Sequence, residues 1–313
     1  MYRLGLLCCC FVWLLPAVVN AVEHMNDHEA FCRQDPATAC LEQLQQALAQ
    51  SEAFSVRWYQ LKSYQLDYFF DKHLEDDLAT QTTQLLQLEA VPAVFRTQLY
   101  FYQAKILHAK GQRIQALHYA DLAANDLEQL FQAFADPLRL VELANLHSVM
   151  GEQAQAWQLL VLADSRYSKS KDPVFWFELN TNKALVQQAN GRLADAAYSR
   201  KLALDAIKPT GDAGKISVAS GNLGRTYQLL GQYGLALHYY QQSLQIMLPG
   251  ADDVRRQLHL LRSAQLHCQL QQYAEARQVL SRIDTTLLET VFRPAHSLLQ
   301  QQLLLPVPHC SAD

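Results

Sequence analysis

Small residues recur along most of this chain with a spacing of 40 residues. Four glycines and one glutamine share the first register position: Gly111, Gly151, Gly191, Gly231 and Gln271. An alanine stands five residues after each of them: Ala116, Ala156, Ala196, Ala236 and Ala276. A small residue stands seven residues before each: Ala104, Ala144, Ala184, Gly224 and Ala264. This register is an internal repeat, and repeats of 20–50 residues indicate arrays of short structural units.

The repeating unit is predicted to be a helical hairpin. Each turn glycine lies between two apolar helical stretches, which is the position just after a helix where left-handed backbone favours glycine. The small residues on either side allow the two helices to approach closely. Prolines lie between successive units, where they disfavour continuation of a helix: Pro137, Pro173, Pro209, Pro249 and Pro294.

The glycines of residues 221–234, GNLGRTYQLLGQYG, do not form a phosphate-binding loop. Neither G-x-G-x-x-G nor G-x-x-x-x-G-K-[ST] occurs in the chain. Because the same positions recur as small residues in the other copies, we interpret these glycines as structural.

Residues 222–240, NLGRTYQLLGQYGLALHYY, resemble the tetratricopeptide repeat consensus. Six residues stand in its signature places: Leu223, Gly224, Tyr227, Gly231, Ala236 and Tyr240. The other copies keep the small residues but lose the aromatic at the position of Tyr227, which is Leu107, His147, Gln187 and His267 in them. The period of 40 exceeds the family's 34 and also falls in the range of HEAT repeats, but the spacing from glycine to alanine favours the tetratricopeptide family.

The resemblance implies an all-α, right-handed solenoid of helical hairpins, and it implies no activity. We expect a signal peptide over residues 1–21 and a segment with a cysteine loop over 22–54. A degenerate first hairpin is expected over 55–96, five repeats over 97–290, and a cap with a tail over 291–313. In the last segment we expect one helix interrupted near Pro294.

The first 21 residues have the features of an export signal. One basic residue, Arg3, precedes an apolar run that ends in Val19-Asn20-Ala21. No lipoprotein-type small residue stands directly before Cys8, so a lipid anchor is not expected. A retained membrane anchor is the alternative, since about eighteen apolar residues nearly span a bilayer. With cleavage, the mature protein is expected to be periplasmic or secreted, without stable membrane insertion.

Four cysteines remain after removal of the signal, and an even number suits an oxidising compartment. Cys32 and Cys40 flank an Asp-Pro turn, and Cys310 follows a double-proline bend that can return it to Cys268. We predict a disulfide between Cys32 and Cys40, and a second between Cys268 and Cys310 is a candidate that the sequence does not decide. A crossed pairing would tie opposite ends of the solenoid, and four unpaired thiols are the remaining alternative.

No catalytic or cofactor motif was found, so we expect neither enzyme activity nor a cofactor. The net charge is −4 at pH 7 without a basic cluster, which argues against nucleic-acid binding. One metal hypothesis concerns the mature terminus. Cleavage after Ala21 would leave Val22-Glu23-His24, in which the amino group, two backbone nitrogens and His24 supply four nitrogens for Cu(II) or Ni(II). An incidental histidine in a terminal tail is the alternative.

The resemblance also implies where a ligand binds. In this family, the first helix of each hairpin lines a concave groove. Its polar positions here are Lys105, Asn145, Asn182, Asn222, Arg225 and Arg262. Tyr102, Glu142, Leu185 and Gln265 share the two register positions, and Glu142 and Leu185 do not suit a simple anion clamp. The alternative is a solvated face without a partner.

Two functions of different class follow. The first is an exported, non-enzymatic scaffold that binds an envelope protein or an extended peptide in its groove. The second is a sensory or regulatory ligand-binding protein that acts with a separate membrane signalling partner, because the layout resembles exported repeat regions of gamma-proteobacterial signalling proteins. The sequence does not identify the partner, the process or the oligomeric state.

Overall fold

The computed structural model describes residues 37–72, 74–134, 137–247, 250, 252–305 and 310. This part of the chain is built from α-helices joined by short turns, and no strand occurs in it. The helices are α3 (Ala37–Gln50), α4 (Val56–Asp71), α5 (Glu75–Leu85), α6 (Ala93–Ala109), α7 (Arg113–Phe134), α8 (Pro137–Val149), α9 (Gln153–Arg166), α10 (Pro173–Ala189), α11 (Leu193–Ile207), α12 (Ala213–Leu229), α13 (Tyr233–Ile246), α14 (Asp253–Gln269), α15 (Tyr273–Leu280) and α16 (Arg293–Leu304).

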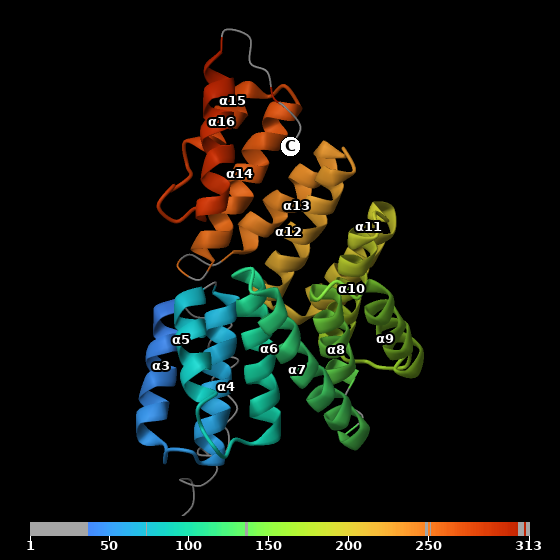
Figure 1. Ribbon diagram of the computed structural model, residues 1–313. Helices are drawn as coiled ribbons and strands as arrows, with labels where there is room; N and C mark the ends of the chain where they lie inside the picture. Colours follow the sequence, from blue (N-terminus) through green and yellow to red (C-terminus); the bar gives the residue numbers. More distant parts are fainter. Residues whose placement is uncertain are drawn as a thin grey trace, which may run out of the picture.

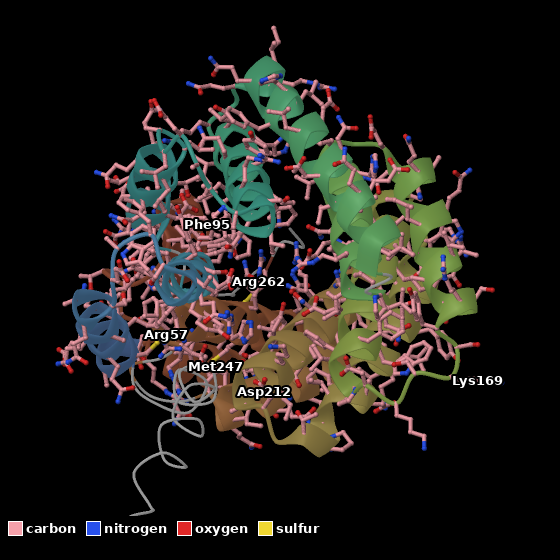
Figure 2. The ribbon with its side chains drawn as sticks, turned by 90° about the horizontal axis from the view of Figure 1, so that it is seen from below. Arg57, Phe95, Lys169, Asp212, Met247 and Arg262 are labelled. Atoms are coloured by element: carbon pink, nitrogen blue, oxygen red, sulfur yellow. A yellow bond between two sulfur atoms is a disulfide. The ribbon has the colours of Figure 1, made fainter. Side chains whose placement is uncertain are left out.

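Successive helices pair into hairpins that stack along a curved path (Figure 1). The pairs are α6 with α7, α8 with α9, α10 with α11, α12 with α13, and α14 with α15. Each second helix also packs on the first helix of the next pair. Seen from below, the helices follow one another round a common centre (Figure 2). The predicted all-α solenoid is therefore confirmed.

The hairpin turns have the left-handed backbone that the glycine register predicts. The φ angles are 72°, 91°, 72° and 70° at Gly111, Gly151, Gly191 and Gly231. The fifth copy has φ 61° at Gln271, so its backbone is the same although its residue is not glycine. At Gly231, the amide of the following Gln232 donates to the carbonyl of Tyr227 at 2.9 Å, which is the bond that closes a helix of this type.

Small residues lie at the helix crossings because there is no room for larger ones. Ala104, Ala144, Ala184 and Ala264 are fully buried. A Cβ atom at Gly224 would lie 3.2 Å from both the Ala236 carbonyl oxygen and the Tyr240 ring. Gly224 is therefore a packing residue, as interpreted, whereas a Cβ atom at Gly231 or Gly234 would meet nothing within 4 Å.

Two helix starts follow local sequence signals, and one expectation was wrong. The Asp172 carboxylate accepts a hydrogen bond from the Val174 amide at 2.9 Å, directly before Pro173 at the start of α10. Glu75 begins α5, where acidic residues suit the helix dipole. Pro294, in contrast, does not interrupt a helix. It lies in the first turn of α16, where its missing amide costs nothing, and the preceding residues form turns and a short 3₁₀ segment.

Helix α3 was not anticipated. Its buried side chains Cys40 and Leu44 are spaced by four residues, and Leu41 and Leu48 also face the core that α3 shares with α4, α5 and α6. The first hairpin, α4 with α5, joins the same core. In the described part of the chain, one additional helix thus precedes this hairpin.

The predicted cysteine pairs differ in how far the structure describes them. Cys268 on α14 and Cys310 lie side by side with Cα atoms 5.8 Å apart, a separation that a disulfide spans. Cys40 is buried in α3, while Cys32 lies outside the described residues. Among the helices described, none combines the length and apolar character that a membrane span requires.

Candidate functional site: the inner surface of the first helices

The candidate binding residues lie on the first helices of successive hairpins. We call the following set the inner surface: Lys105, Glu142, Asn145, Glu178, Asn182, Asn222, Arg225 and Arg262. Arg262 of α14 points toward the centre that the helices surround. Lys169, in the connection after α9, lies at the outer rim (Figure 2). The first helices α8 and α10 also pack directly on one another.

Lys105 is held by aromatic rings. Its Nζ atom lies 4.3 Å from the centre of the Phe101 ring and 4.8 Å from that of Phe70 on α4. Such contacts stabilise an ammonium group. Other groups surround the side chain closely, although it keeps some contact with solvent. Burial lowers the pKa of Lys105 to about 8, and the charges of Glu142 and Glu178 oppose that shift.

Two asparagines connect the middle of the inner surface. The Asn145 amide on α8 donates to the Asn182 side-chain oxygen on α10 at 2.6 Å. Asn182 also donates to the Glu178 carbonyl at 2.9 Å, and it is only 6% exposed. Asn182 therefore holds α8 and α10 together, whereas the half-buried Asn145 and Glu142 lie closer to solvent.

Arginines dominate the inner surface at α12 and α14. Arg225 and Arg262 are both half-buried, and Arg262 donates to the Gln265 side chain at 3.1 Å. Burial raises the pKa of the Tyr240 phenol to about 12, while the positive charges of Arg262, Arg225 and Arg200 oppose this shift. The same three guanidinium groups are thus close enough to act on one buried phenol.

Arg200 on α11 was missed by the sequence analysis. It is 6% exposed and donates to the Asn222 carbonyl at 2.6 Å and to the Thr226 hydroxyl. Burial lowers its pKa to about 10, still far above neutral, so it is cationic. The sequence contained a signal for Arg200, because the other copies have an uncharged residue at the same register position. These residues are all buried: Ala120, Leu160, Tyr240 and Leu280.

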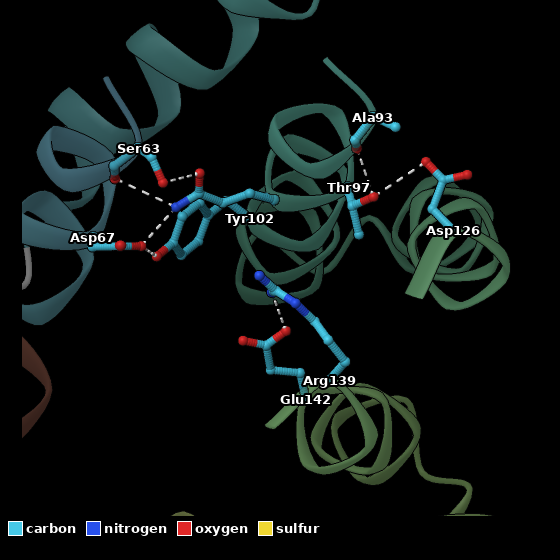
Figure 3. Close-up of polar contacts among 9 residues, drawn as sticks. Ser63, Asp67, Ala93, Thr97, Tyr102, Asp126, Arg139 and Glu142 are labelled. Carbon is cyan, nitrogen blue, oxygen red and sulfur yellow. Dashed lines mark hydrogen bonds and ion pairs between the residues drawn. The ribbon is translucent and has the colours of Figure 1, made fainter. Parts of the chain in front are cut away.

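Tyr102 shares the inner register but its hydroxyl is used inside the protein. It donates to the Asp67 carboxylate on α4 (Figure 3). Gln98 donates to the same carboxylate oxygen at 2.7 Å, and the Ser63 hydroxyl donates to Gln98 at 2.7 Å. Figure 3 also shows Arg139 bound to Glu142 on α8, at 2.7 Å. The bonds of Tyr102 and Gln98 to Asp67 and Ser63 fix the first hairpin against the first repeat, whereas the Arg139–Glu142 pair lies within α8.

The remaining sequence hypotheses concern metals and histidines. No group of three metal-ligating side chains occurs among the described residues. His24, the candidate ligand of Cu(II) or Ni(II), lies outside them. His147 contacts Glu152 with its Nδ1 atom at 2.5 Å, and His267 contacts Gln272 in the same way at 2.7 Å. Both histidines thus bridge a hairpin turn.

Comparison with known proteins identifies the fold. Residues 177–248 match the family model of the tetratricopeptide repeat. Among curated proteins, none matches the chain significantly in sequence.

Several solved structures resemble the chain. One is a Rap protein complexed with the competence and sporulation factor. The alignment covers 85% of this chain and 76% of the Rap chain, with a TM-score of 0.58 and 14% identity. For aspartyl phosphate phosphatase F from Bacillus subtilis, the alignment covers 94% of this chain and 82% of the phosphatase, with a TM-score of 0.55 and 12% identity. For NprR in complex with its cognate peptide NprX, the alignment covers 91% of this chain and 83% of NprR, with a TM-score of 0.54 and 16% identity. At these identities the likeness concerns the fold. Residues 177–248 are therefore tetratricopeptide repeats, and the described chain has the fold of a tetratricopeptide-type helical solenoid.

Proposed function

We propose that this protein is an exported, non-enzymatic scaffold that binds an extended peptide, or an extended segment of another protein, along its inner surface. The observation that carries the proposal is the set of half-buried polar side chains on the first helices α6, α8, α12 and α14, namely Lys105, Asn145, Asn222, Arg225 and Arg262. Such side chains can bind a peptide's carbonyl groups and carboxylates, and tetratricopeptide-type folds support this use. NprR, which is similar in fold, was solved with its cognate peptide NprX, and the Rap protein was solved with the competence and sporulation factor.

Export and partner remain part of the proposal. The apolar run and the Val19-Asn20-Ala21 sequence support a cleaved signal, so the partner would be an envelope protein or peptide. A regulatory role is the second candidate, favoured by the competence and sporulation factor named in the Rap complex. In that role the bound peptide would be the input, and a separate membrane protein would carry the output.

The test compares peptide binding by the wild-type protein and a variant of the inner surface. A random-sequence peptide library is incubated with each protein, and the retained peptides are quantified by mass spectrometry. We expect the combined variant Asn222→Ala, Arg225→Ala and Arg262→Ala to lose retention. A hydrogen bond to a charged group contributes about 1.5–3 kcal/mol, or roughly tenfold or more in affinity for each arginine.

Lys201→Ala is the matched control, because Lys201 is a cation on the second helix α11 and pairs with Asp205 there. It should retain the same peptides as the wild type. Circular dichroism must show unchanged helicity and melting in all variants. Equal retention by the wild type and the triple variant would place the binding surface elsewhere.

A further inference from the structure

The solvent-facing side of α16 is apolar. At one end of the described array, α16 packs on α14 and α15 and buries Leu299 and Leu303 (Figure 1). On the opposite side, Leu298, Leu304 and the C-cap residue Leu305 are 51%, 77% and 50% exposed. The helical period places six exposed residues on this side, and we call them the outer face of α16: Pro294, Ser297, Leu298, Gln301, Leu304 and Leu305.

The outer face of α16 contains no charged residue. After Arg293, the sequence has no aspartate, glutamate, lysine or arginine before Asp313. The solvent-facing side of a helix ordinarily carries charged and polar residues. Helix α3, at the other end of the described array, follows this rule, because it exposes Glu42 together with Gln43, Gln45, Gln46 and Gln50. The α16 end therefore differs in chemistry from the α3 end.

The chain that follows α16 returns to α14. The Cα atoms of Cys310 and Cys268 lie 5.8 Å apart, and the Gln269 side chain donates to the Cys310 carbonyl at 3.3 Å. Cys310 also packs against the core that contains Leu299 and Leu303. It thus lies on the buried side of α16, and the outer face stays open to solvent in the described part of the chain.

We propose that the outer face of α16 is a homodimer interface, in which two copies of the chain pack α16 against α16 about a two-fold axis. Pro294, Leu298, Gln301 and Leu305 follow one another at steps of four, three and four residues. This is the spacing with which paired helices pack along a common seam. A two-fold axis brings the same face together from both copies, so each seam residue meets a seam residue of the other chain.

Charge favours a second copy as the occupant. Each chain has a net charge of −4, so most surfaces of two copies repel one another. The two outer faces meet without that repulsion, because neither contains a charged side chain. Contact between the α16 end of one copy and the α3 end of the next would instead place Glu42 and its neighbouring glutamines against leucines. Such head-to-tail contacts would also build open chains, whereas the two-fold contact closes with two copies.

The size of the outer face suits a reversible dimer. It presents roughly 500 Å² of accessible surface, which is at the upper end for a surface patch of a monomer. A standard interface buries about 800 Å² on each partner, so this interface is a small one. The protein is therefore expected to be monomeric in dilute solution and to dimerise at higher micromolar concentrations.

Sedimentation velocity of the purified full-length protein, over a range of micromolar concentrations, tests the proposal. We expect a concentration-dependent equilibrium between monomer and dimer. Leu298→Glu combined with Leu305→Glu should weaken the dimer about a hundredfold or more, because the interface would bury unpaired charges. The matched control is Leu162→Glu combined with Leu202→Glu, since these leucines are 45% and 38% exposed on α9 and α11. The control variant should dimerise like the wild type.

A mixture of two variants tests direct contact between the copies. Leu298→Glu alone and Leu298→Lys alone should each be mainly monomeric, whereas the mixture of the two proteins should form a mixed dimer. A folding defect does not produce this recovery. The proposal is overturned if the wild type stays monomeric at every concentration, or if the variant with two glutamates dimerises as well as the wild type. Assemblies that grow beyond two copies would also overturn it, because they indicate head-to-tail contacts.

Discussion

At the scale of single residues, two glycines near one hairpin turn show how backbone conformation alone, without steric clashes, affects stability. Gly231 has φ 70° and Gly234, three residues later in α13, has no positive φ. A Cβ atom at either position would meet nothing within 4 Å. Any difference between their substitutions therefore comes from the backbone.

We expect Gly231→Ala to destabilise the protein by about 1 kcal/mol, because an L-residue resists left-handed backbone. Gly234→Ala should be neutral or stabilise it by up to about 1 kcal/mol through helix propensity. Gln271→Gly, which places glycine at φ 61° in the fifth turn, should stabilise the protein. Urea unfolding followed by circular dichroism measures all three. Equal effects at positions 231 and 234 would contradict this explanation.

At Gly221, in contrast, the space available for a side chain determines how a substitution affects stability. A Cβ atom there would lie 2.3 Å from Cε1 of His259, whose ring also bonds Ser243 at 3.0 Å and packs edge-on against Tyr240. We expect Gly221→Ala to destabilise the protein by about 1–3 kcal/mol through overpacking. In the background of His259→Ala the same substitution should cost much less, and a double-mutant cycle with no coupling would contradict the contact.

His259 also predicts a pH dependence. Burial lowers its pKa to about 3, with Arg255 adding to the shift, so the folded protein keeps it neutral. In the unfolded chain its pKa is near 6.5. The unfolded state therefore binds the extra proton below pH 6.5, and stability present above that pH is lost as the pH falls toward 3.

The measurement is the free energy of unfolding in urea between pH 6.5 and 4.5, where most carboxylates stay ionised. Wild type should lose stability more steeply than His259→Gln, by up to about 1.4 kcal/mol per pH unit. Parallel slopes for the two proteins would show that His259 is protonated in the folded state as well.

At the scale of helices, the repeat predicts the hairpins because each small residue reports a close crossing. Gly224 and Ala236 are such a pair, and their contact is visible in the sequence as a spacing. The site was less predictable, because its contacts join different repeats. Lys105 rests on Phe70, which lies in the first hairpin outside the 40-residue register, and Asn182 is buried by bonding to Asn145. A repeat pattern places residues on a helix face but does not specify their neighbours on the next helix.

The last helix provides a prediction at the same scale. A disulfide between Cys268 and Cys310 would close a loop of 42 residues that contains α15 and α16. By chain entropy such a closure stabilises by up to about 4 kcal/mol. We expect Cys310→Ser, or reduction of the wild type, to lower the melting temperature. In the Cys310→Ser variant, reduction should not destabilise α15 and α16 any further. Mass spectrometry of the unreduced protein after proteolysis identifies the linked peptides, and two alkylated cysteines there would contradict the pairing.

At the scale of the whole molecule, a solenoid is stabilised by contacts between neighbouring units, so its middle and its ends differ. Helices α10 to α13 pack against neighbours on both sides. They also share buried polar bonds, including Ser243 to the Ser217 carbonyl at 2.8 Å and Arg200 to the Asn222 carbonyl at 2.6 Å. At the two ends of the described array, α3 packs chiefly on α4, and α16 packs on α14 and α15.

Backbone hydrogen exchange followed by mass spectrometry tests this gradient. We expect the slowest exchange in α10 to α13 and the fastest helical exchange in α3 and α16, because opening an end breaks one interface whereas opening the middle breaks two. Arg200→Ala leaves the Asn222 carbonyl without its buried donor, and it should speed exchange in α11 and α12 while leaving α4 and α6 unchanged. The Lys201→Ala variant, altered at the next residue but on the exposed side, should exchange like the wild type. Uniform exchange along the wild-type chain, or an Arg200→Ala effect that spreads equally to α4, would mean that the array unfolds as one cooperative unit.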